Sequence, residues 1–263
     1  MNQTRQTAEF SNIRLILEFD GSAFNGWQVQ VKGRTVQGEI ERAIYEVTGE
    51  KVRVTGCSRT DAGVHAKQFV LNFPTKTKIP AERLRYPLNN KLPADIRILE
   101  STKVPLTFHA RKHALAKTYV YRFINAEIEP AIGRQYISLE KGELDEAAMQ
   151  AVLPLFLGRH DFKAFMSQGS PVASTLRVIY QLKLERDNNQ YTLSVTGNGF
   201  LYNMVRIIVG TLFYVGHGTR TLEDVRRALT LGNRDLAGKV AQARGLMLER
   251  VIYDPADPIL NLE

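Results

Sequence analysis

Residues 52–73 read VRVTGCSRTDAGVHAKQFVLNF, and this stretch sets the frame for the fold. Valine alternates with a polar residue at 52–54, and apolar side chains alternate again at 69–73, so each segment is predicted to be a β-strand. Gly56 and Gly63 bound the polar loop between the two strands. Because glycine adopts positive φ angles and lets a partner approach the backbone, this loop can present its central side chains to a ligand.

The loop places a carboxylate two residues after an arginine. An arginine within reach would keep Asp61 ionised and oriented, and Arg59 is the nearest one in sequence. An ordinary Asx-type turn, with Arg59 in solvent, accounts for the same spacing and is favoured if the loop is considered alone. Cys57 is the only cysteine of the chain. It therefore forms no intramolecular disulfide, and without a His or Asn pairing motif it is predicted to be a small, partly buried filler.

Further elements flank this stretch in the order β-α-β-β-α-β. Alternating apolar residues predict a strand at 13–19, and a one-sided apolar pattern predicts a helix at 36–47. Thr35 is the predicted N-cap of this helix, and Gly49 is its predicted end. The remaining elements are a short helix that begins at Pro80 and a strand at 96–99.

The second half repeats this order in a longer form. Its predicted elements are a strand at 119–123, a helix at 144–156, a hairpin of strands 178–184 and 191–195, a helix at 201–213, a helix from Thr221 and a strand at 246–253. Two copies of the split β-α-β pattern predict an α+β fold of two ferredoxin-like (RRM-like) halves with antiparallel sheets. We expect an N-terminal domain over residues 1–107, which carries the Asp loop, and a C-terminal domain over residues 108–263, which completes the active site.

The composition favours a polyanionic partner. The 263 residues include 35 basic and 27 acidic side chains, which gives a net charge of +8 and a pI near 9.6. Nucleic acid is the commonest partner of this kind. No apolar run is long enough to span a bilayer, and the polar N-terminus lacks the apolar centre of a secretion signal. A cytoplasmic location and no membrane partner are therefore expected.

Five sequence blocks stand in an order that is typical of one family. They are DGS (20–22) with GWQ (26–28), GCSRTDAGVHA (56–66), FHAR (108–111) with KTYVY (117–121), NGFLYNMVR (198–206), and GLML (245–248). Together they resemble the tRNA pseudouridine synthase A (TruA) family over nearly the whole chain. Ser58 is a departure, because many relatives carry glycine there. The resemblance implies that the two halves form a pseudouridine synthase core.

The resemblance implies isomerisation of uridine to pseudouridine in the anticodon stem and loop of tRNA, at positions 38, 39 and 40 in tRNA numbering. It implies tRNA as the partner and no cofactor or catalytic metal. A homodimer is expected, because family members bind tRNA across two subunits. In the reaction the bond from ribose C1′ to base N1 breaks, the base rotates, and C1′ rejoins at C5. The motif match makes Asp61 the nucleophile, and attack at C6, attack at C1′ and removal of the 2′ proton all stay open.

Other implied site residues come from separate blocks. Arg206 is implied as the cation paired with Asp61, which would lower the pKa of that carboxyl and orient it. Its apolar neighbours argue against the alternative, a solvated arginine on an amphipathic helix. Tyr119 is implied to stack on the uracil, a contact worth about 1–3 kcal/mol. Leu246 would pack beside it and exclude water, although Tyr119 and Leu246 fit ordinary core positions equally well.

Two arginines are implied to bind the RNA backbone. Arg59 would fill the gap left by the everted nucleotide or hold its phosphate, and Arg111 would be a phosphate ligand. Such contacts position RNA without specifying its sequence. His65 and His109 lie in polar loops, where lone histidines more often serve hydrogen bonding, so neither is assigned a catalytic role. Trp27 fits a core anchor.

Two other classes of protein stay open. One is a non-catalytic RNA-binding module with RRM-like halves, but neither half carries the Gly-Phe-Gly-Phe type of aromatic signature that such modules use for stacking. The other is a phosphate-handling hydrolase that uses Asp61. That enzyme would need further carboxylates for a metal, or a P-loop with Lys and Ser/Thr, and the Asp61 loop supplies neither. Metal dependence of any activity would separate the hydrolase from the synthase.

Overall fold

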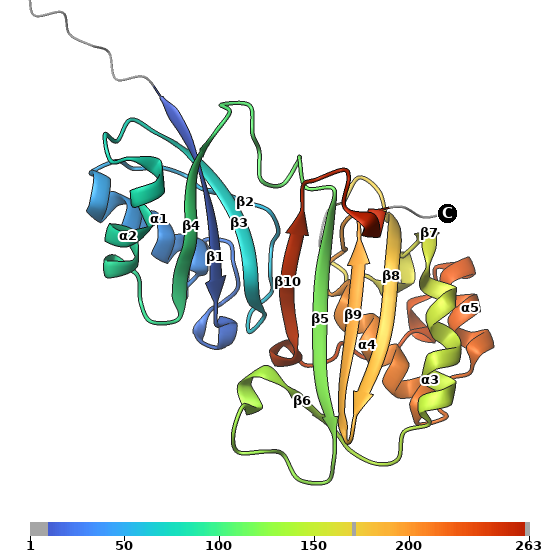
Figure 1. The fold of residues 1–263 in the computed structure, drawn as a ribbon. Coiled ribbons are helices and arrows are strands. Elements are labelled where there is room, and N and C mark those ends of the chain that lie inside the picture. Colours follow the sequence, from blue (N-terminus) through green and yellow to red (C-terminus); the bar gives the residue numbers. More distant parts are fainter. Residues whose placement is uncertain (1–9, 170–171, 261–263) are drawn as a thin grey trace, which may run out of the picture.

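The computed structural model describes residues 10–169 and 172–260, and their strands join into one sheet (Figure 1). The N-terminal elements are β1 (Ser11–Phe19), α1 (Val36–Thr48), β2 (Thr55–Gly56), β3 (His65–Thr75), α2 (Arg85–Lys91) and β4 (Ile96–Val104). Their strand order is β4-β1-β3-β2, with antiparallel neighbours throughout. This is the arrangement of a ferredoxin-like half, as the β-α-β-β-α-β pattern predicts.

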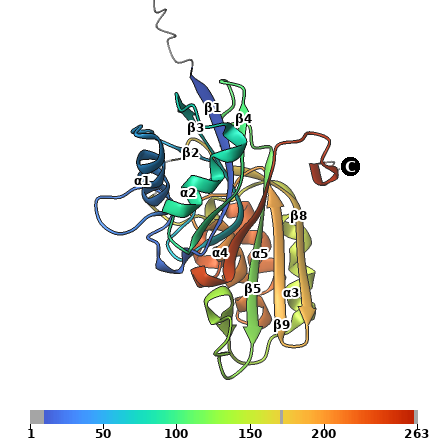
Figure 2. The same ribbon diagram turned by 60° about the vertical axis from the view of Figure 1, so that its left-hand side comes forward.

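The C-terminal elements build a second unit of the same kind. They are β5 (Ala116–Asn125), β6 (Ser138–Glu140), α3 (Glu146–Val152), β7 (Gly158–Asp161), β8 (Leu176–Asp187), β9 (Gln190–Gly197), α4 (Met204–Gly216), α5 (Leu222–Leu231) and β10 (Leu246–Ile252). Four of these strands follow the antiparallel order β10-β5-β9-β8. Both views show α1 and α2 beside the N-terminal strands and α3, α4 and α5 beside the C-terminal ones (Figures 1 and 2). The predicted α+β class with two ferredoxin-like halves is confirmed.

The two halves meet along one edge of β3. At the start of this strand, residues 65–66 pair in parallel with residues 247–248 of β10. Further along, residues 71–72 pair with residues 55–56 of β2. The edge thus serves two partners, one from nearby in the sequence and one from the far end of the chain. The loop that connects β2 to β3 leaves the sheet at this junction.

Helix α4 is held against the C-terminal strands by an aromatic cluster. The ring of Phe123 on β5 stacks on Tyr191 of β9 with centroids 4.7 Å apart, and Phe213 of α4 meets Phe123 edge to face at 4.9 Å. The helix is apolar on nearly all sides, and only Arg206 and Tyr214 among its residues are not fully buried. The structure therefore contradicts the alternative in which Arg206 is a solvated arginine on an amphipathic helix.

Helix ends with their own capping signals lie where the sequence predicts them. Thr35 accepts the N–H of Gly38 at the start of α1, and Gly49 ends that helix with a φ of +75°. The helix predicted from Thr221 is α5, and Thr221 and Asp224 form a capping box at its start. No helix in the described part of the chain is long and apolar enough to cross a membrane.

Some predicted bounds were wrong. The strand expected at 52–54 is instead β2 at Thr55–Gly56, and the N–H of Val54 donates to Glu41 Oε1 on α1 at 3.0 Å instead of to β3. The helix expected at 201–213 begins only at Met204, since Asn203 adopts a left-handed conformation with a φ of +61°. Strands β6 and β7 were not predicted, because segments of three and four residues show no usable periodicity.

Candidate active site

A cavity of about 380 Å³ opens at the junction of the two halves. Its walls come from residues 57–64 between β2 and β3, called the Asp61 loop, and from β5, the segment before α4 and the start of β10. The implied site residues that line it are Arg59, Asp61, Arg111, Tyr119 and Leu246. The sixth implied residue, Arg206, contacts Asp61. The fold therefore gathers all six from blocks that are far apart in the sequence.

Arg206 reaches Asp61 from the first turn of α4. Its Nη1 donates to Asp61 Oδ2 at 3.3 Å and to Asn203 Oδ1 at 2.8 Å, and its Nε donates to the carbonyl oxygen of Ala241 at 2.7 Å. The N–H of Ala241 donates back to the Arg206 carbonyl oxygen at 3.1 Å. Because Asn203 and Ala241 hold the guanidinium, its position does not depend on Asp61. The ion pair is a single contact rather than two parallel hydrogen bonds.

Burial raises the pKa of the Asp61 carboxyl above its ordinary value. Arg206 lowers this pKa through its charge and its hydrogen bond, but the loss of water around the carboxylate outweighs both effects. Arg206 thus acts in the expected direction, but the net pKa is raised instead of lowered, because the local sequence does not show how far the second half covers Asp61. A carboxylate with a raised pKa is a stronger base than an exposed aspartate, which suits a catalytic group.

The Asp61 loop packs directly on the segment Gly26–Trp27. The N–H of Trp27 donates to the carbonyl oxygen of Thr60 at 3.1 Å. Gly26 has a φ of +87°, and a Cβ placed there would lie 2.6 Å from that same oxygen. The ring of Trp27 stacks on Phe69 of β3 at 4.2 Å, which anchors the segment in the core. Trp27 is thus the predicted core anchor, and its block also supports the loop that carries Asp61.

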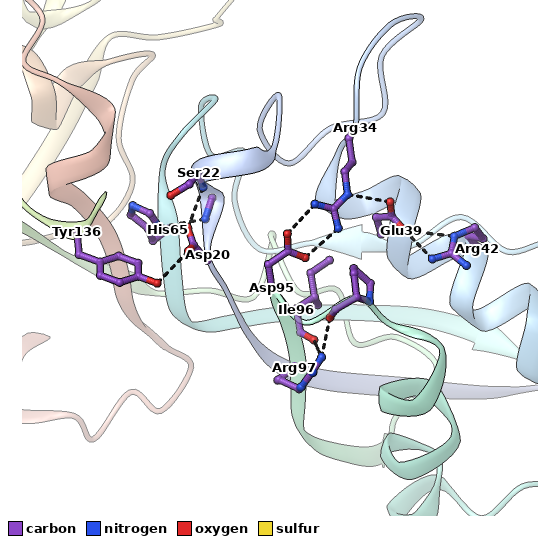
Figure 3. A network of polar contacts seen from close by, with 12 residues as sticks. Asp20, Ser22, Arg34, Glu39, Arg42, His65, Asp95, Ile96, Arg97 and Tyr136 are labelled. Carbon is purple, nitrogen blue, oxygen red and sulfur yellow. Dashed lines mark hydrogen bonds and ion pairs between the residues drawn. The ribbon is translucent and has the colours of Figure 1, made fainter. Parts of the chain in front are cut away.

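A polar network lies at the other end of the Asp61 loop (Figure 3). His65 begins β3 and is buried, and its Nδ1 accepts the N–H of Gly21 at 3.0 Å. Asp20 Oδ1 lies 3.1 Å from the same nitrogen, and the hydroxyl of Tyr136 donates to Asp20 Oδ2 at 2.9 Å. Burial lowers the pKa of His65, which favours the neutral ring. His65 lies outside the cavity and connects the N-terminal half to the segment between β5 and β6.

Aromatic rings and a leucine form the apolar side of the cavity. Tyr119 on β5 is only 6% exposed, and its hydroxyl shares a hydrogen bond of 3.0 Å with Ser58 Oγ. Its ring meets Phe200 edge to face at 5.2 Å. Leu246 of β10 lies opposite Tyr121 of β5. Because Tyr121 and Tyr119 are two residues apart on the same strand, Leu246 and Tyr119 point to the same face of the sheet. Burial raises the pKa of Tyr119 and keeps its phenol neutral.

Four cationic side chains line the cavity. Arg59 and Arg111 were implied by the sequence and are exposed, whereas Lys117 and Arg177 are partly buried and were missed. Lys117 stands two residues before Tyr119 on β5, so strand alternation places both on one face and would have indicated it. Arg177 carries no such signal, because it reaches the cavity only through the pairing of β8 with β9.

Two other candidate residues, Cys57 and His109, do not line the cavity. Cys57 is fully buried, and burial raises the pKa of its thiol to about 11, as expected of a filler. His109 is absent from the cavity lining, and its Nδ1 accepts the N–H groups of Arg111 and Lys112 within one turn. Within residues 10–169 and 172–260, no group of three or more His, Cys, Asp or Glu side chains could hold a metal ion.

Comparisons with known proteins agree with the geometry. The family model described as tRNA pseudouridine synthase matches residues 15–111 and 152–254. The chain is 49% identical over 242 residues to the tRNA pseudouridine synthase A of Clostridium botulinum (strain Alaska E43 / Type E3), which covers 92% of this chain and 99% of the relative. The protein of the same name from Acetivibrio thermocellus is 45% identical with the same coverage. Among solved structures, a chain of a Cbf5-Nop10-Gar1 complex aligns with 89% of this chain and 57% of its own length, at 11% identity and a TM-score of 0.37.

Both segments of the family match contribute to the cavity. The first contains the Asp61 loop and Arg111, and the second contains Arg206 and Leu246. The model spans most of the chain, and the curated relatives match along nearly their whole length. The chain therefore belongs to the tRNA pseudouridine synthase family, whose members are isomerases.

Proposed function

We propose that this protein isomerises uridine to pseudouridine in the anticodon stem and loop of tRNA, with Asp61 as the nucleophile. One observation carries the proposal. Asp61 is the only carboxylate among the described residues that line the cavity, and it contacts Arg206 and shares the cavity with Tyr119 and Leu246. Family membership supplies the reaction class, and this arrangement supplies a group that can perform it.

The reaction moves ribose C1′ from N1 to C5 of the same base. The N1–C1′ bond breaks, the base turns within the cavity, and the C1′–C5 bond forms. C5 loses its proton and N1 gains one, so the product is an isomer of the substrate and no oxidant or reductant takes part. Attack of Asp61 at C6, attack at C1′ and removal of the 2′ proton are three routes to this product, and all use the ionised carboxylate.

The target base must leave its stack to reach Asp61. A cavity of about 380 Å³ falls within the range of about 300–1,000 Å³ that is usual for small-ligand sites. Its apolar side, with Tyr119 and Leu246, offers the base a surface for stacking and keeps water from the reacting carbon. We assign the ring of Tyr119 to the base, and Arg59 and Arg111 to the phosphates that flank it.

The anticodon arm, the homodimer and the cytoplasmic location complete the proposal. The net charge of +8 suits a large RNA substrate, and the relatives bear the name tRNA pseudouridine synthase A. A tRNA is larger than one such chain, which favours binding across two subunits. Light scattering of the purified protein tests the homodimer. Mapping of pseudouridine by reverse transcription after carbodiimide treatment tests the positions in the anticodon arm.

The deciding experiment measures tritium release from tRNA labelled at uracil C5, with EDTA present and no metal added. We expect release by the wild type and none by Asp61→Asn, which still binds tRNA. Asp187→Asn is the matched control, because it makes the same chemical change on an exposed hairpin residue outside the cavity. Release by Asp61→Asn at the wild-type rate would refute the nucleophile. Binding without release by the wild type, over several tRNAs with anticodon-arm uridines, would refute the activity.

A further inference from the structure

The cavity holds an excess of positive charge that the reaction at Asp61 does not explain. Its lining includes Arg59, Arg111, Lys117 and Arg177 but only one carboxylate, Asp61, and that carboxylate already contacts Arg206. Among the described residues, none of the four lining cations forms an ion pair with an acidic side chain. Cations that share a partly buried space without a counter-charge repel one another, so the folded protein is less stable for holding them.

Lys117 is the most confined of these cations. Its cross-strand neighbour on β9 is Gly197, and the space that a Cβ there would enter is taken by the carbonyl oxygen of Val178 and the ring of Phe200. Burial lowers the pKa of Lys117, and the charges of Arg111 and Arg177 lower it further. The thiol of Cys57 offers no compensation, because its own pKa is raised to about 11 and it is neutral at physiological pH. Within residues 10–169 and 172–260, Lys117 therefore has no anionic partner.

Arg177 lies where the active-site cavity meets a second cavity of about 260 Å³. It lines both spaces, and the second one also includes Arg159 and Asn198. Its Nη1 donates to the carbonyl oxygens of Ser174 and Leu176, at 2.9 and 2.6 Å. These backbone contacts fix one side of the guanidinium without neutralising it. The remaining donors of the fork stay available for an anion.

The position of Arg177 is itself well determined. Asn198 Oδ1 accepts the N–H of Val178 at 3.0 Å, and the N–H of Asn198 donates to the Val178 carbonyl oxygen at 3.0 Å. This reciprocal pair fastens the start of β8 to the end of β9, next to Gly197 and thus close to Lys117. The guanidinium of Arg177 is therefore held in place before any ligand binds, beside the strand that carries Lys117, and such preorganisation favours an anion site.

We propose that Lys117 and Arg177 form a phosphodiester-binding subsite, which holds the RNA backbone beyond the two phosphates assigned to Arg59 and Arg111 and directs the strand into the second cavity beside Arg159. This inference rests on the proposed function, because it takes the ligand to be the strand that delivers the target base to Asp61. A phosphodiester matches the site chemically, since it is a monoanion with two free oxygens that a guanidinium and an ammonium contact together. Its role is positioning, and it reads no base.

The test combines protein variants with RNA that lacks single charges. Each anticodon stem-loop RNA of a series carries one neutral methylphosphonate linkage, which is placed at successive positions on both sides of the target uridine, beyond the two flanking phosphates as well as at them. Each RNA is bound to the full-length wild type, Lys117→Gln, Arg177→Gln and the control Lys183→Gln. Lys183 is exposed on the same strand as Arg177, lines none of the cavities described here and loses the same charge. Fluorescence anisotropy over a salt series gives the Kd and its salt dependence.

We expect Lys117→Gln and Arg177→Gln each to weaken binding of unmodified RNA by about 10–100-fold, since each loses a charged hydrogen bond. The slope of log K against log salt should fall by about 0.7 for each lost contact. Neutralising one particular linkage should weaken RNA binding by the wild type by the same amount, about 10–100-fold. The same neutral linkage should cause no further loss of affinity in Lys117→Gln or Arg177→Gln. Lys183→Gln should bind like the wild type to within about twofold.

Thermal unfolding separates this role from a structural one. Removal of an unpaired, partly buried cation should raise the Tm in Lys117→Gln, whereas a lysine that supports the fold would lower it. Lys117→Arg and Arg177→Lys keep the charge and should restore most of the RNA affinity. These two variants also keep the test decisive if a glutamine variant folds poorly.

The proposal is overturned if both glutamine variants bind RNA as tightly as Lys183→Gln does. It is also overturned if, at every position, the loss of affinity caused by the neutral linkage is as large in the two variants as in the wild type. Failure of the proposed function looks different. In that case the charge coupling would be found but no tritium would be released by any form of the protein. Release at the wild-type rate with no coupling at any linkage would instead refute the subsite alone.

Discussion

Gly26 is the position where one methyl group tests how the Asp61 loop is held. Its φ is +87°, and a Cβ placed there lies 2.6 Å from the carbonyl oxygen of Thr60 and 3.1 Å from the carbonyl carbon of Asp61. Ordinary contact begins at 3.4 Å. The Gly26→Ala substitution must therefore move the loop by about 0.8 Å, the difference between 3.4 and 2.6 Å.

The expected loss follows from that displacement. A catalytic group misplaced by about 1 Å loses about 100-fold in rate, so a shift slightly below 1 Å should lower kcat by about 10–100-fold. The positive φ adds a cost of about 1–2 kcal/mol to the free energy of folding for any residue with a Cβ. The affinity for tRNA should change by less than about threefold, because the cations assigned to RNA phosphates mostly lie on elements other than this loop.

Single-turnover pseudouridine formation at saturating tRNA measures the chemical step, and urea unfolding measures the stability. Gly49→Ala is the matched control. Gly49 has a φ of +75° at the end of α1, and a Cβ there meets no atom within 4 Å. It should lose a similar free energy of unfolding and keep the wild-type rate. If Gly26→Ala behaves like Gly49→Ala in rate as well as in stability, the contact with Thr60 does not position Asp61.

Three further predictions concern titration and burial. Burial raises the pKa of the Asp61 carboxyl, so the folded state resists ionisation and loses stability as the pH rises from the unfolded value of 3.8 through the raised folded pKa. Asp61→Asn should therefore unfold at a higher Tm than the wild type at pH 7, with a smaller difference at pH 4, and calorimetry that shows no gain at pH 7 would contradict this. Arg206→Gln removes the cation that opposes the shift, so the acid limb of the single-turnover pH profile should move to higher pH; an unmoved limb would mean that Arg206 does not act on Asp61. Cys57 is buried and the pKa of its thiol is raised to about 11, so iodoacetamide at pH 7 should label it, by mass spectrometry, only after unfolding.

Sequence patterns correctly predicted the helix ends that are set by capping residues a few positions away. The Thr35 cap and Gly49 bound α1, and the capping box at Thr221 starts α5, because each signal acts on the backbone a few residues away. The short length of β2 has a different cause. Residues 52–54 form no ladder with β3, and the N–H of Val54 donates instead to the carboxylate of Glu41 on α1 at 3.0 Å. No pattern within 52–56 contains that contact.

In the candidate site, too, some features follow from short stretches of sequence and others arise only from segments that are far apart in the chain. Asp61, Tyr119 and Arg206 were found through blocks of sequence, not through periodicity, which fits core positions equally well. The raised pKa of Asp61 escaped prediction because it arises from segments of the second half that cover the carboxylate. Arg177 escaped because only strand pairing brings it to the cavity. The domain boundary at 107–108 and the homodimer stay predictions.

The position of the cavity explains why chemistry and fold are coupled in this protein. Asp61 comes from the N-terminal half and Arg206 from the C-terminal half, and the edge of β3 where the halves join is also where the Asp61 loop leaves the sheet. Any loosening of the β3–β10 pairing should therefore separate the carboxylate from its cation before either half unfolds. The free site is also strained electrostatically, because it holds a buried carboxylate of raised pKa and because its four lining cations form no ion pair with the acidic side chains that the structure describes. Under the proposed function, an RNA phosphate would supply negative charge to these cations, so substrate binding should tighten the junction at the point where the two halves must stay together for catalysis.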